Sequence, residues 1–259
     1  MPGRGPKKRA VRGDVSEHLC ALADLFPADQ PSIDEPAWLP TPLDPASLFA
    51  SAAPIELEVG CGKGLFLASA AAAHPDRNFL GVELAPGYAH MTAARCVRRN
   101  CENARVVSGD ATLMIRSLVA DQCVQAVHVY FPDPWWKARH RKRRVLCEPF
   151  FEQAARILRA DGTVHVWTDV EEYFHEAMDA AASTGLFLPP RDVAERAAEH
   201  DTDYHTHFER RTRLAEKPVW RAELDRSEQK PPARQPITSY ERIRLLAGSA
   251  PESEPDHSA

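Results

Sequence analysis

The chain has 259 residues, of which 27% are charged and 44% hydrophobic, so it is long enough for one large globular domain or two small ones. Its net charge of −5 excludes a protein that is basic over its whole surface, so any affinity for a polyanion must come from a local patch. Six cysteines without a CxxC pair argue against a disulfide framework or a zinc site and indicate reduced thiols. No segment is apolar enough to span a membrane, and no apolar stretch follows the basic N-terminus as in a secretory signal. We therefore expect a cytoplasmic protein.

The two ends of the chain differ in composition from its middle. Residues 1–40 predict a flexible basic and proline-rich segment, and residues 226–259 a disordered polar tail. In residues 41–225, strand-like and helix-like segments alternate, which is typical of a mostly parallel sheet with helices on both faces. The predicted strands are Ile55–Gly60, Asn78–Glu83, Ala104–Ser108, Val124–Tyr130, Thr163–Thr168 and an antiparallel edge strand at Lys217–Leu224, and the predicted helices are Leu65–Ala73, Tyr88–Asn100, Thr112–Ala120, Cys147–Leu158 and Glu171–Ser183.

A glycine-rich turn follows the first predicted strand. Gly60, Gly62 and Gly64 let the backbone pass close to a ligand, where any Cβ would collide. Their GxGxG spacing differs from the GxGxxG of dinucleotide-binding folds, because residue 65 is Leu.

Three carboxylates lie near this turn in the predicted sheet. Glu83 ends the next strand, where it can accept hydrogen bonds from both ribose hydroxyls of a nucleoside. Asp110 follows the third strand, beside the expected adenine edge, and Glu58 can face an ammonium group. A pyrophosphate is disfavoured among three acids, whereas S-adenosylmethionine, a cationic ligand that carries adenosine, is accepted. The alternative is a tight turn with solvated acids at the strand ends.

A rigid acidic segment and a cationic run follow the fourth predicted strand, Val124–Tyr130. Asp133 lies between Pro132 and Pro134, which stiffen the turn. Six of the eight residues from Lys137 to Arg144 are Lys or Arg, which indicates phosphate binding, although a solvated loop has the same composition. An acid beside a polyanion-binding surface suggests chemistry on nucleic acid.

These motifs resemble, in their order along the chain, the bacterial tRNA (guanine-N7)-methyltransferase family, which modifies guanine 46 of the variable loop. The resemblance covers about residues 57–224 and implies a Rossmann-like class I methyltransferase fold acting on tRNA, as a monomer or homodimer. It is carried by the glycine turn, Glu83, Asp110, the run Phe131-Pro132-Asp133-Pro134-Trp135-Trp136-Lys137-Ala138-Arg139-His140, Thr168-Asp169 and Thr206-His207-Phe208-Glu209.

The resemblance also implies roles for individual residues. The glycine turn (Gly60, Gly62, Gly64), Glu58, Glu83, Asp110 and Asp133 would bind S-adenosylmethionine, with Asp133 also catalytic. Lys137, Asp169, Thr206, His207, Phe208 and Glu209 would bind the substrate, and Arg139, His140, Arg141, Lys142, Arg143 and Arg144 would contact RNA.

The residues are compatible with methylation of guanine N7. This atom has a lone pair and no proton, so it needs no strong general base, and the sequence offers no Ser-His-Asp or Cys-His set. Catalysis would come mainly from placing two reactants in line, an effect worth up to ~7–11 kcal/mol. Asp133 could stabilise the cation that develops on the purine, and Asp169 could accept from guanine N1–H or its exocyclic amine.

Several alternatives remain open from the sequence. Thr206–Glu209 also fits a helix capping box, and a similar run occurs at Thr238–Glu241, although no strand follows it. Trp135 and Trp136 could stack on a base or pack in the core. The rival functions are methylation of an exocyclic amine and RNA binding without catalysis. The cluster of His200, Asp201, Asp203, His205 and His207 fits no standard zinc spacing, so we expect no metal.

Overall fold

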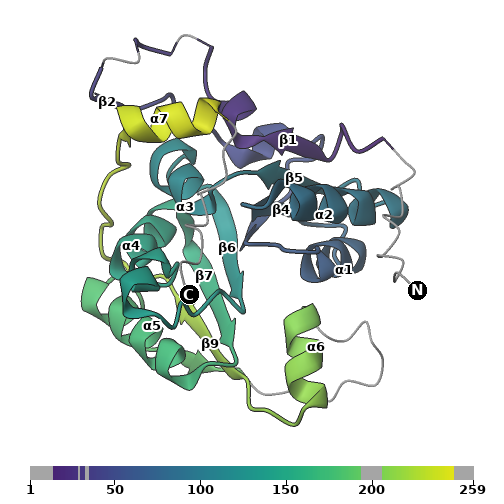
Figure 1. The fold of residues 1–259 in the computed structure, drawn as a ribbon, viewed down its shortest axis with the longest axis vertical. Helices are drawn as coiled ribbons and strands as arrows, with labels where there is room; N and C mark the ends of the chain where they lie inside the picture. Colours follow the sequence, from purple (N-terminus) through teal and green to yellow (C-terminus); the bar gives the residue numbers. More distant parts are fainter. Residues whose placement is uncertain (1–13, 29, 33–34, 194–205, 248–259) are drawn as a thin grey trace, which may run out of the picture.

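The computed structural model describes residues 14–28, 30–32, 35–193 and 206–247 of the chain. Within these residues an eight-stranded sheet crosses the molecule in the order β1-β5-β4-β3-β6-β7-β9-β8 (Figure 1). Neighbouring strands from β1 to β7 in this order are parallel, whereas β9 is antiparallel to both β7 and β8. The strands are β1 (Leu19–Ala21), β3 (Ile55–Val59), β4 (Asn78–Glu83), β5 (Ala104–Ser108), β6 (Val124–Tyr130), β7 (Leu158–Thr168), β8 (Arg191–Asp192) and β9 (Trp220–Asp225).

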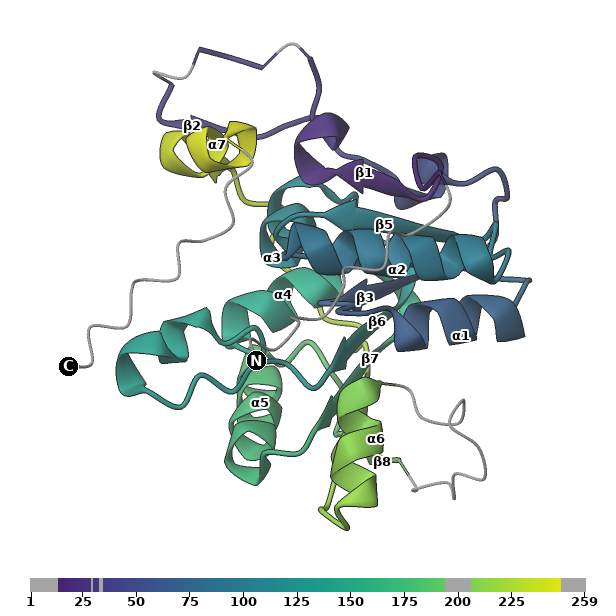
Figure 2. The same cartoon turned by 45° about the vertical axis from the view of Figure 1, so that its right-hand side comes forward.

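Helices cover both faces of the sheet (Figures 1 and 2). One face carries α1 (Leu65–Ala73), α2 (Pro86–Arg98) and, near β9, α6 (His207–Leu214). The other carries a mixed helix, α3 (Ala111–Leu113) continued by the π-helix η3 (Met114–Leu118), together with α4 (Glu148–Ile157) and α5 (Glu171–Thr184). The prediction of a mostly parallel sheet between helices is therefore confirmed.

The largest apolar core lies between the sheet and helices α3 to α5. Valines alternate along the two central strands β6 and β7, so that every second side chain enters this layer. There they pack on Phe151 of α4 and Tyr173 of α5, both fully buried. Burial of each such side chain contributes about 1.5–3 kcal/mol, which holds both central strands in a fixed position.

The strand order reverses at the middle of the sheet, and this reversal positions the site. The chain passes from β3 outward through β4 to β5, and then returns to place β6 on the other side of β3. Val59 at the end of β3 is paired with Val129 of β6. The turns after both strands therefore emerge side by side at one edge, which is where ligands bind in open parallel sheets.

The ends of the domain are more ordered than the sequence predicted. The N-terminal part contains β1, which pairs with β5, and the helical turns η1 (Leu22–Leu25) and η2 (Pro45–Leu48). In the segment predicted as a disordered tail, β10 (Ile237–Thr238) pairs with β2 (Ala37–Trp38), and α7 (Ser239–Leu246) follows. Residues 1–13 and 248–259 lie outside the described part.

Buried contacts explain this order. Ile237 is fully buried, and the guanidinium of Arg242, only 1% exposed, donates to the carbonyl of Ser32 at 2.5 Å, 210 residues away. The N- and C-terminal parts of the chain therefore contact each other directly. The antiparallel strand predicted at the edge of the sheet is confirmed as β9, and the two-residue strand β8 pairs with its outer side. No helix among the described residues could cross a membrane.

Candidate active site

The glycine turn leaves β3 in a left-handed backbone conformation that favours glycine. Gly60, Gly62 and Gly64 have φ angles of 73°, 53° and 67°. A Cβ at Gly64 would lie 2.4 Å from Cγ2 of Thr92 on α2, so this position also allows the turn to pack closely on that helix. A Cβ at Gly60 would meet nothing within 4 Å, which leaves space beside the backbone for a ligand.

Glu83, at the end of β4, holds this turn in place. Its Oε2 accepts the backbone N–H of Gly62 at 2.8 Å, and its Oε1 accepts that of Ala85 at 2.8 Å. An ionised carboxylate has about four acceptor positions, so two remain for other donors such as ribose hydroxyls. The structural and the cofactor-binding interpretations of Glu83 are thus compatible.

Asp110 caps a helix with one carboxylate oxygen and leaves the other available to a ligand. Its Oδ1 caps α3 by accepting the backbone N–H groups of Thr112 at 2.9 Å and Leu113 at 3.2 Å. Its Oδ2 makes no hydrogen bond with the described residues, and the side chain is exposed at the same edge as Glu83.

Glu58 lies beneath the turn, 3% exposed, and accepts a backbone hydrogen bond from Leu67. Its Oε2 is buried without a hydrogen-bond partner in the described part of the chain. Burial, followed by repulsion from Glu83, raises the pKa of Glu58 to about 8. A buried carboxyl oxygen without a donor fits a cationic ligand, which would supply the missing charge.

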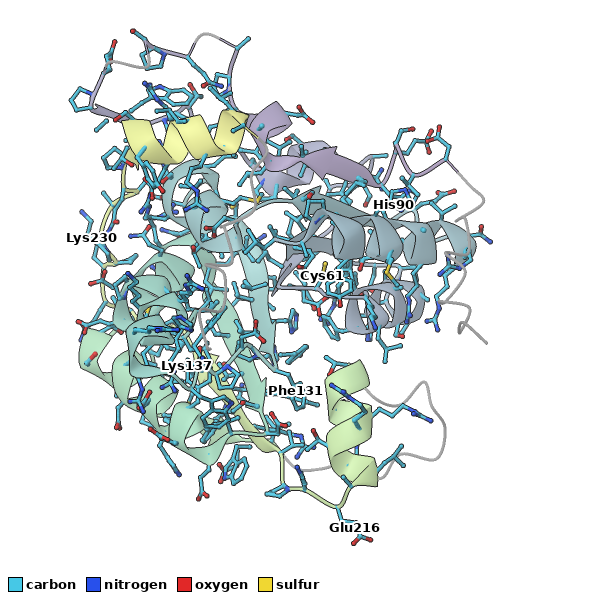
Figure 3. All side chains as sticks on the ribbon, viewed as in Figure 1. Cys61, His90, Phe131, Lys137, Glu216 and Lys230 are labelled. Atoms are coloured by element: carbon cyan, nitrogen blue, oxygen red, sulfur yellow. The ribbon has the colours of Figure 1, made fainter. Side chains whose placement is uncertain are left out.

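The segment after β6 presents Asp133. Phe131 and Trp135 have φ angles of 52° and 45°, which is unusual for aromatic residues and costs of order 1–3 kcal/mol each. Asp133 lies between them, exposed and without a hydrogen bond to the described residues. Figure 3 shows Phe131 on the same side of the sheet edge as α6, and Cys61 in the glycine turn. Asp133 is therefore available to a ligand at this edge.

The basic run forms the short helix η4 (Ala138–Arg143) and divides into two groups. Lys137, Arg139 and Lys142 are exposed, as expected for residues that contact RNA. Arg141 forms ion pairs with Glu172 and Glu176 of α5, at 2.9 and 3.3 Å.

The remaining members of the run contact the Asp133 segment. Arg143 lies 5.1 Å over the ring of Trp135, and His140 meets the same ring edge to face at 5.7 Å. Arg144 is buried and ion-paired with Glu176, so the prediction that it contacts RNA does not fit this geometry. Trp136 is 64% exposed, whereas the ring of Trp135 packs against Arg143 and His140.

The predicted substrate residues lie at the ends of β7 and α6. Asp169, exposed after β7, accepts a hydrogen bond from Thr212 Oγ1 of α6 at 3.3 Å. Thr206 caps α6 by accepting the backbone N–H of Glu209 at 2.9 Å, as the capping alternative predicted. The side chains of His207 and Phe208 lie outside the described part, as do residues 200, 201, 203 and 205 of the histidine and aspartate cluster.

Glu209 lines a cavity and lies beside two arginines. Its carboxylate is 1% exposed and lies 3.2 Å from Arg213 and 3.8 Å from Arg221. The similar run at Thr238 forms the complete capping box of α7, and its Glu241 is ion-paired with Arg116 at 2.9 Å. The second run therefore has a structural explanation.

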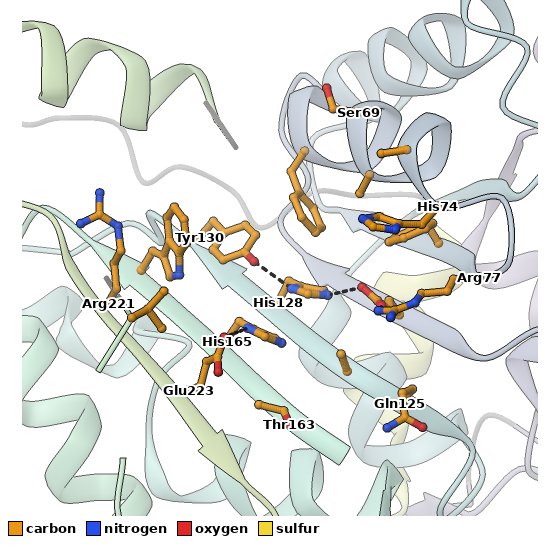
Figure 4. A pocket seen from close by; sticks show the side chains of 18 of the residues that line it. Ser69, His74, Arg77, Gln125, His128, Tyr130, Thr163, His165, Arg221 and Glu223 are labelled. Carbon is orange, nitrogen blue, oxygen red and sulfur yellow. Dashed lines mark hydrogen bonds and ion pairs between the residues drawn. The ribbon is translucent and has the colours of Figure 1, made fainter. Parts of the chain in front are cut away.

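A polar face of the sheet, which the sequence did not predict, lines a cavity of about 970 Å³ between α1 and α6 (Figure 4). His128 and His165 stack at 4.6 Å across β6 and β7, and His128 bridges Glu56 at 2.8 Å and the Tyr130 hydroxyl at 2.9 Å. Burial alone would raise the pKa of Glu56, but hydrogen bonds from His128 and Arg77 lower it to about 2. Among the described residues that line this cavity, none belongs to the glycine turn or is Asp133.

A signal for this face was present in the sequence. Polar and aromatic residues alternate with aliphatic ones in Glu56-Leu57-Glu58, His128-Val129-Tyr130 and His165-Val166-Trp167. Central parallel strands are usually apolar on both faces, so the alternation indicates that one face is not fully covered by a helix.

Known proteins match the chain over the part that forms this site. The protein-family profile Methyltransf_4, described as "Putative methyltransferase", matches residues 52–222. A protein of Rhodopirellula baltica named tRNA (guanine-N(7)-)-methyltransferase is 43% identical over 203 residues, 74% of this chain and 75% of its own length. A Sodalis glossinidius protein of the same name is 35% identical over 180 residues, 69% of this chain and 75% of its own length.

A solved structure with low sequence identity shares the fold. The crystal structure of the 16S rRNA methyltransferase KamB superposes with a TM-score of 0.51 at 15% identity, and covers 74% of this chain and 99% of that one. At this identity the likeness concerns the arrangement of strands and helices.

Proposed function

The chain belongs to the tRNA (guanine-N7)-methyltransferase family, and from this premise we propose that it transfers the methyl group of S-adenosylmethionine to N7 of the variable-loop guanine, guanine 46, in tRNA. The observation that carries the proposal is the pairing of β3 with β6, which brings the glycine turn beside the Asp133 segment. One turn offers space for a nucleoside and the other an available carboxylate, so a donor and an acceptor of the methyl group can meet between them.

The cofactor would be held by residues of three neighbouring strand ends. Glu83 has acceptor capacity for ribose hydroxyls, Asp110 Oδ2 is available at the adenine side, and Glu58 Oε2 provides buried negative charge near the cationic end. The glycine turn leaves room for the ligand to approach the backbone. When bound, S-adenosylmethionine supplies an electrophilic methyl group on sulfur.

The chain's own residues would position the guanine and stabilise charge. N7 attacks with its lone pair, so no residue has to remove a proton before the transfer. Positive charge grows on the purine, and the fixed carboxylate of Asp133 stabilises it at that edge. Asp169 accepts from guanine N1–H or the exocyclic amine, and Lys137 acts beside Asp133 at the reacting base, while the exposed cations of η4 bind the phosphates of the tRNA.

The proposal is tested with unmethylated tRNA and labelled S-adenosylmethionine, followed by nucleoside analysis. We expect 7-methylguanosine from the variable loop. An N2-methylated guanosine would support the rival class that methylates exocyclic amines, and no product despite tRNA binding would support an RNA-binding protein without catalysis.

A second measurement concerns the role of Asp133. Asp133→Asn keeps the shape of the side chain and removes its charge, so turnover should fall while tRNA binding persists. Since N7 carries no proton, the wild-type rate should also be flat from neutral to mildly alkaline pH. Equal loss of binding and turnover would indicate that Asp133 only shapes the turn.

A further inference from the structure

Contacts with neighbouring elements hold the segment of residues 131–135, which carries Asp133, in its conformation. The backbones of Phe131 and Trp135 have positive φ angles, in the left-handed region. Aromatic residues do not favour this conformation on their own, so neighbouring contacts must maintain it. On the side of β7, the backbone N–H of Phe131 donates to the carbonyl of Trp167 at 2.7 Å. The other end of the segment is held by the basic run, which folds back over it.

Arg144 makes the central contact. Its Nε donates to the carbonyl of Pro134 at 2.7 Å, directly after Asp133 in the chain. Its Nη1 is ion-paired with Glu176, and its guanidinium lies 4.8 Å over the ring of Tyr173. Both of these partners belong to α5, so one side chain connects the Asp133 segment to a helix packed on the core.

Tyr173 extends the same connection. It is fully buried on α5, and its hydroxyl accepts the backbone N–H of Leu146 at 3.1 Å, two residues after Arg144. The backbone after η4 is thereby fixed to the helix that pairs with the Arg144 side chain. The backbone next to Arg144 is thus anchored, and the planar guanidinium donates from separate nitrogens to a carbonyl and a carboxylate in a fixed geometry, which the single nitrogen of a lysine does not provide.

RNA binding and a purely stabilising role both fit the contacts of Arg144 less well. RNA binding would require an accessible guanidinium, but the side chain is only 6% exposed. Stability alone would be a weak reason for these contacts, because the Glu176 side chain is 41% exposed and such ion pairs contribute little net free energy. In addition, Nη2 of Arg144 is buried without a hydrogen bond in the described part of the chain, which is unfavourable for stability.

We propose that Arg144 is a positioning residue: by binding the Pro134 carbonyl and Glu176 together, it fixes the Asp133 carboxylate against α5 at the place where methyl transfer occurs. This inference rests on the proposed function for its catalytic consequence, but its structural part is independent of that function. The basic run then has two roles, since its exposed cations face solvent while Arg144 holds the catalytic segment.

The test compares Glu176→Gln with Glu172→Gln as a matched control. The two glutamates lie one turn apart on α5 and both pair with Arg141, but only Glu176 also pairs with Arg144. Arg144→Ala and Arg144→Lys are measured beside them. The readouts are kcat and KM for tRNA and cofactor, the salt dependence of tRNA affinity, and amide hydrogen exchange of a peptide covering residues 131–137.

We expect Arg144→Ala to lower kcat about 100-fold, the effect of a misplaced catalytic group, with KM for tRNA and the salt slope changed little. Arg144→Lys should recover only part of this loss. Glu176→Gln should lower kcat and Glu172→Gln should not. Exchange of residues 131–137 should become faster in Arg144→Ala and Glu176→Gln alone.

Each result that would contradict the proposal points to a different role of Arg144. Unchanged kcat with a salt slope reduced by about one unit would make Arg144 an RNA contact. Unchanged kcat and unchanged exchange with a lower melting temperature would make it a structural residue only. If the wild-type protein forms no 7-methylguanosine, the proposed function fails, and the exchange measurement still decides whether Arg144 holds the segment. If Arg144→Ala does not fold, Arg144→Lys and the glutamate pair decide it.

Discussion

Glu83 and Gly62 are joined by a hydrogen bond of 2.8 Å between the carboxylate at the end of β4 and the backbone of the glycine turn after β3. The side chain that is expected to bind the ribose therefore also sets the shape of the turn that faces the ligand. Binding of cofactor and local folding of the site depend on the same carboxylate.

The first prediction follows from this shared role. Glu83→Ala removes a charged acceptor, and hydrogen bonds to charged groups are worth about 1.5–3 kcal/mol. Cofactor affinity, measured by calorimetry, should fall roughly 10- to 150-fold, and the melting temperature of the unliganded protein should also fall. Glu83→Gln keeps one acceptor oxygen, so its cofactor affinity should lie between those of the wild-type protein and Glu83→Ala. Unchanged affinity in the alanine variant would disprove the ribose assignment.

The second prediction concerns pH and Glu58. Its pKa is raised to about 8 in the folded protein, from an ordinary value of 4.5, first by burial and then by Glu83. Between these two values the folded state binds a proton that the unfolded chain does not, so stability should fall as pH rises through this window. Glu58→Gln cannot titrate, and its melting temperature should depend less on pH between about 5 and 8.

A calorimetric measurement extends the same prediction. A cation bound beside Glu58 favours the ionised carboxylate, so cofactor binding at pH 7 should release up to about one proton. Titrations in buffers of different ionisation enthalpy measure this number. Glu58→Gln should abolish the release, and an equal release from both proteins would assign the proton to another group.

The third prediction concerns the exposed cations of η4. Arg139 and Lys142 face solvent, and each phosphate contact contributes about 0.7–0.9 to the slope of log affinity against log salt. The double replacement Arg139→Ala and Lys142→Ala should therefore flatten the slope for tRNA by about 1.5 units. Lys230→Ala removes an exposed lysine outside the run and should leave the slope unchanged. A wild-type slope in the double variant would place the RNA surface elsewhere.

The fourth prediction concerns stability. Arg242 is buried on α7, and its guanidinium donates to backbone carbonyls of the N-terminal part, so Arg242→Ala should cost about 1.5–3 kcal/mol. In a domain of this size the melting temperature should fall by roughly 3–12 °C. Arg244→Ala, on the same helix but stacked only on Tyr240, is the control and should change it by much less. Equal effects would contradict a special role of Arg242.

The sequence predicted the central elements well because their signals are local. The predicted bounds of β4, β5, β6 and α1 match the structure, since each combines an apolar pattern with a clear turn at its end. Asp133 was singled out because two prolines flank it, and its catalytic role stays a prediction. The glycine turn was found because its three glycines are needed where φ is positive.

The remaining features depend on contacts between distant residues. The charge of Arg144 suggested contact with RNA, and only its burial and its ion pair with Glu176 of α5 support the positioning role that we propose. Similarly, α7 is polar in composition and became a predicted tail, although one arginine anchors it to carbonyls 210 residues away. No local pattern indicates such a pairing, because it depends on how the whole chain folds.

The pairing of β2 with β10 has a consequence for the order of folding during synthesis. All the strands of the large sheet are synthesised before Ile237 and Arg242. The contacts of Trp38 with Ile237 and of Ser32 with Arg242 can then form only at the end, across a loop that includes every strand of the large sheet except β1. Closing so long a loop costs little more entropy than closing one half as long, because the cost grows with the logarithm of its length. The domain is thus completed by β10 and α7, and a nascent chain that lacks both exposes the apolar surface that Ile237 covers.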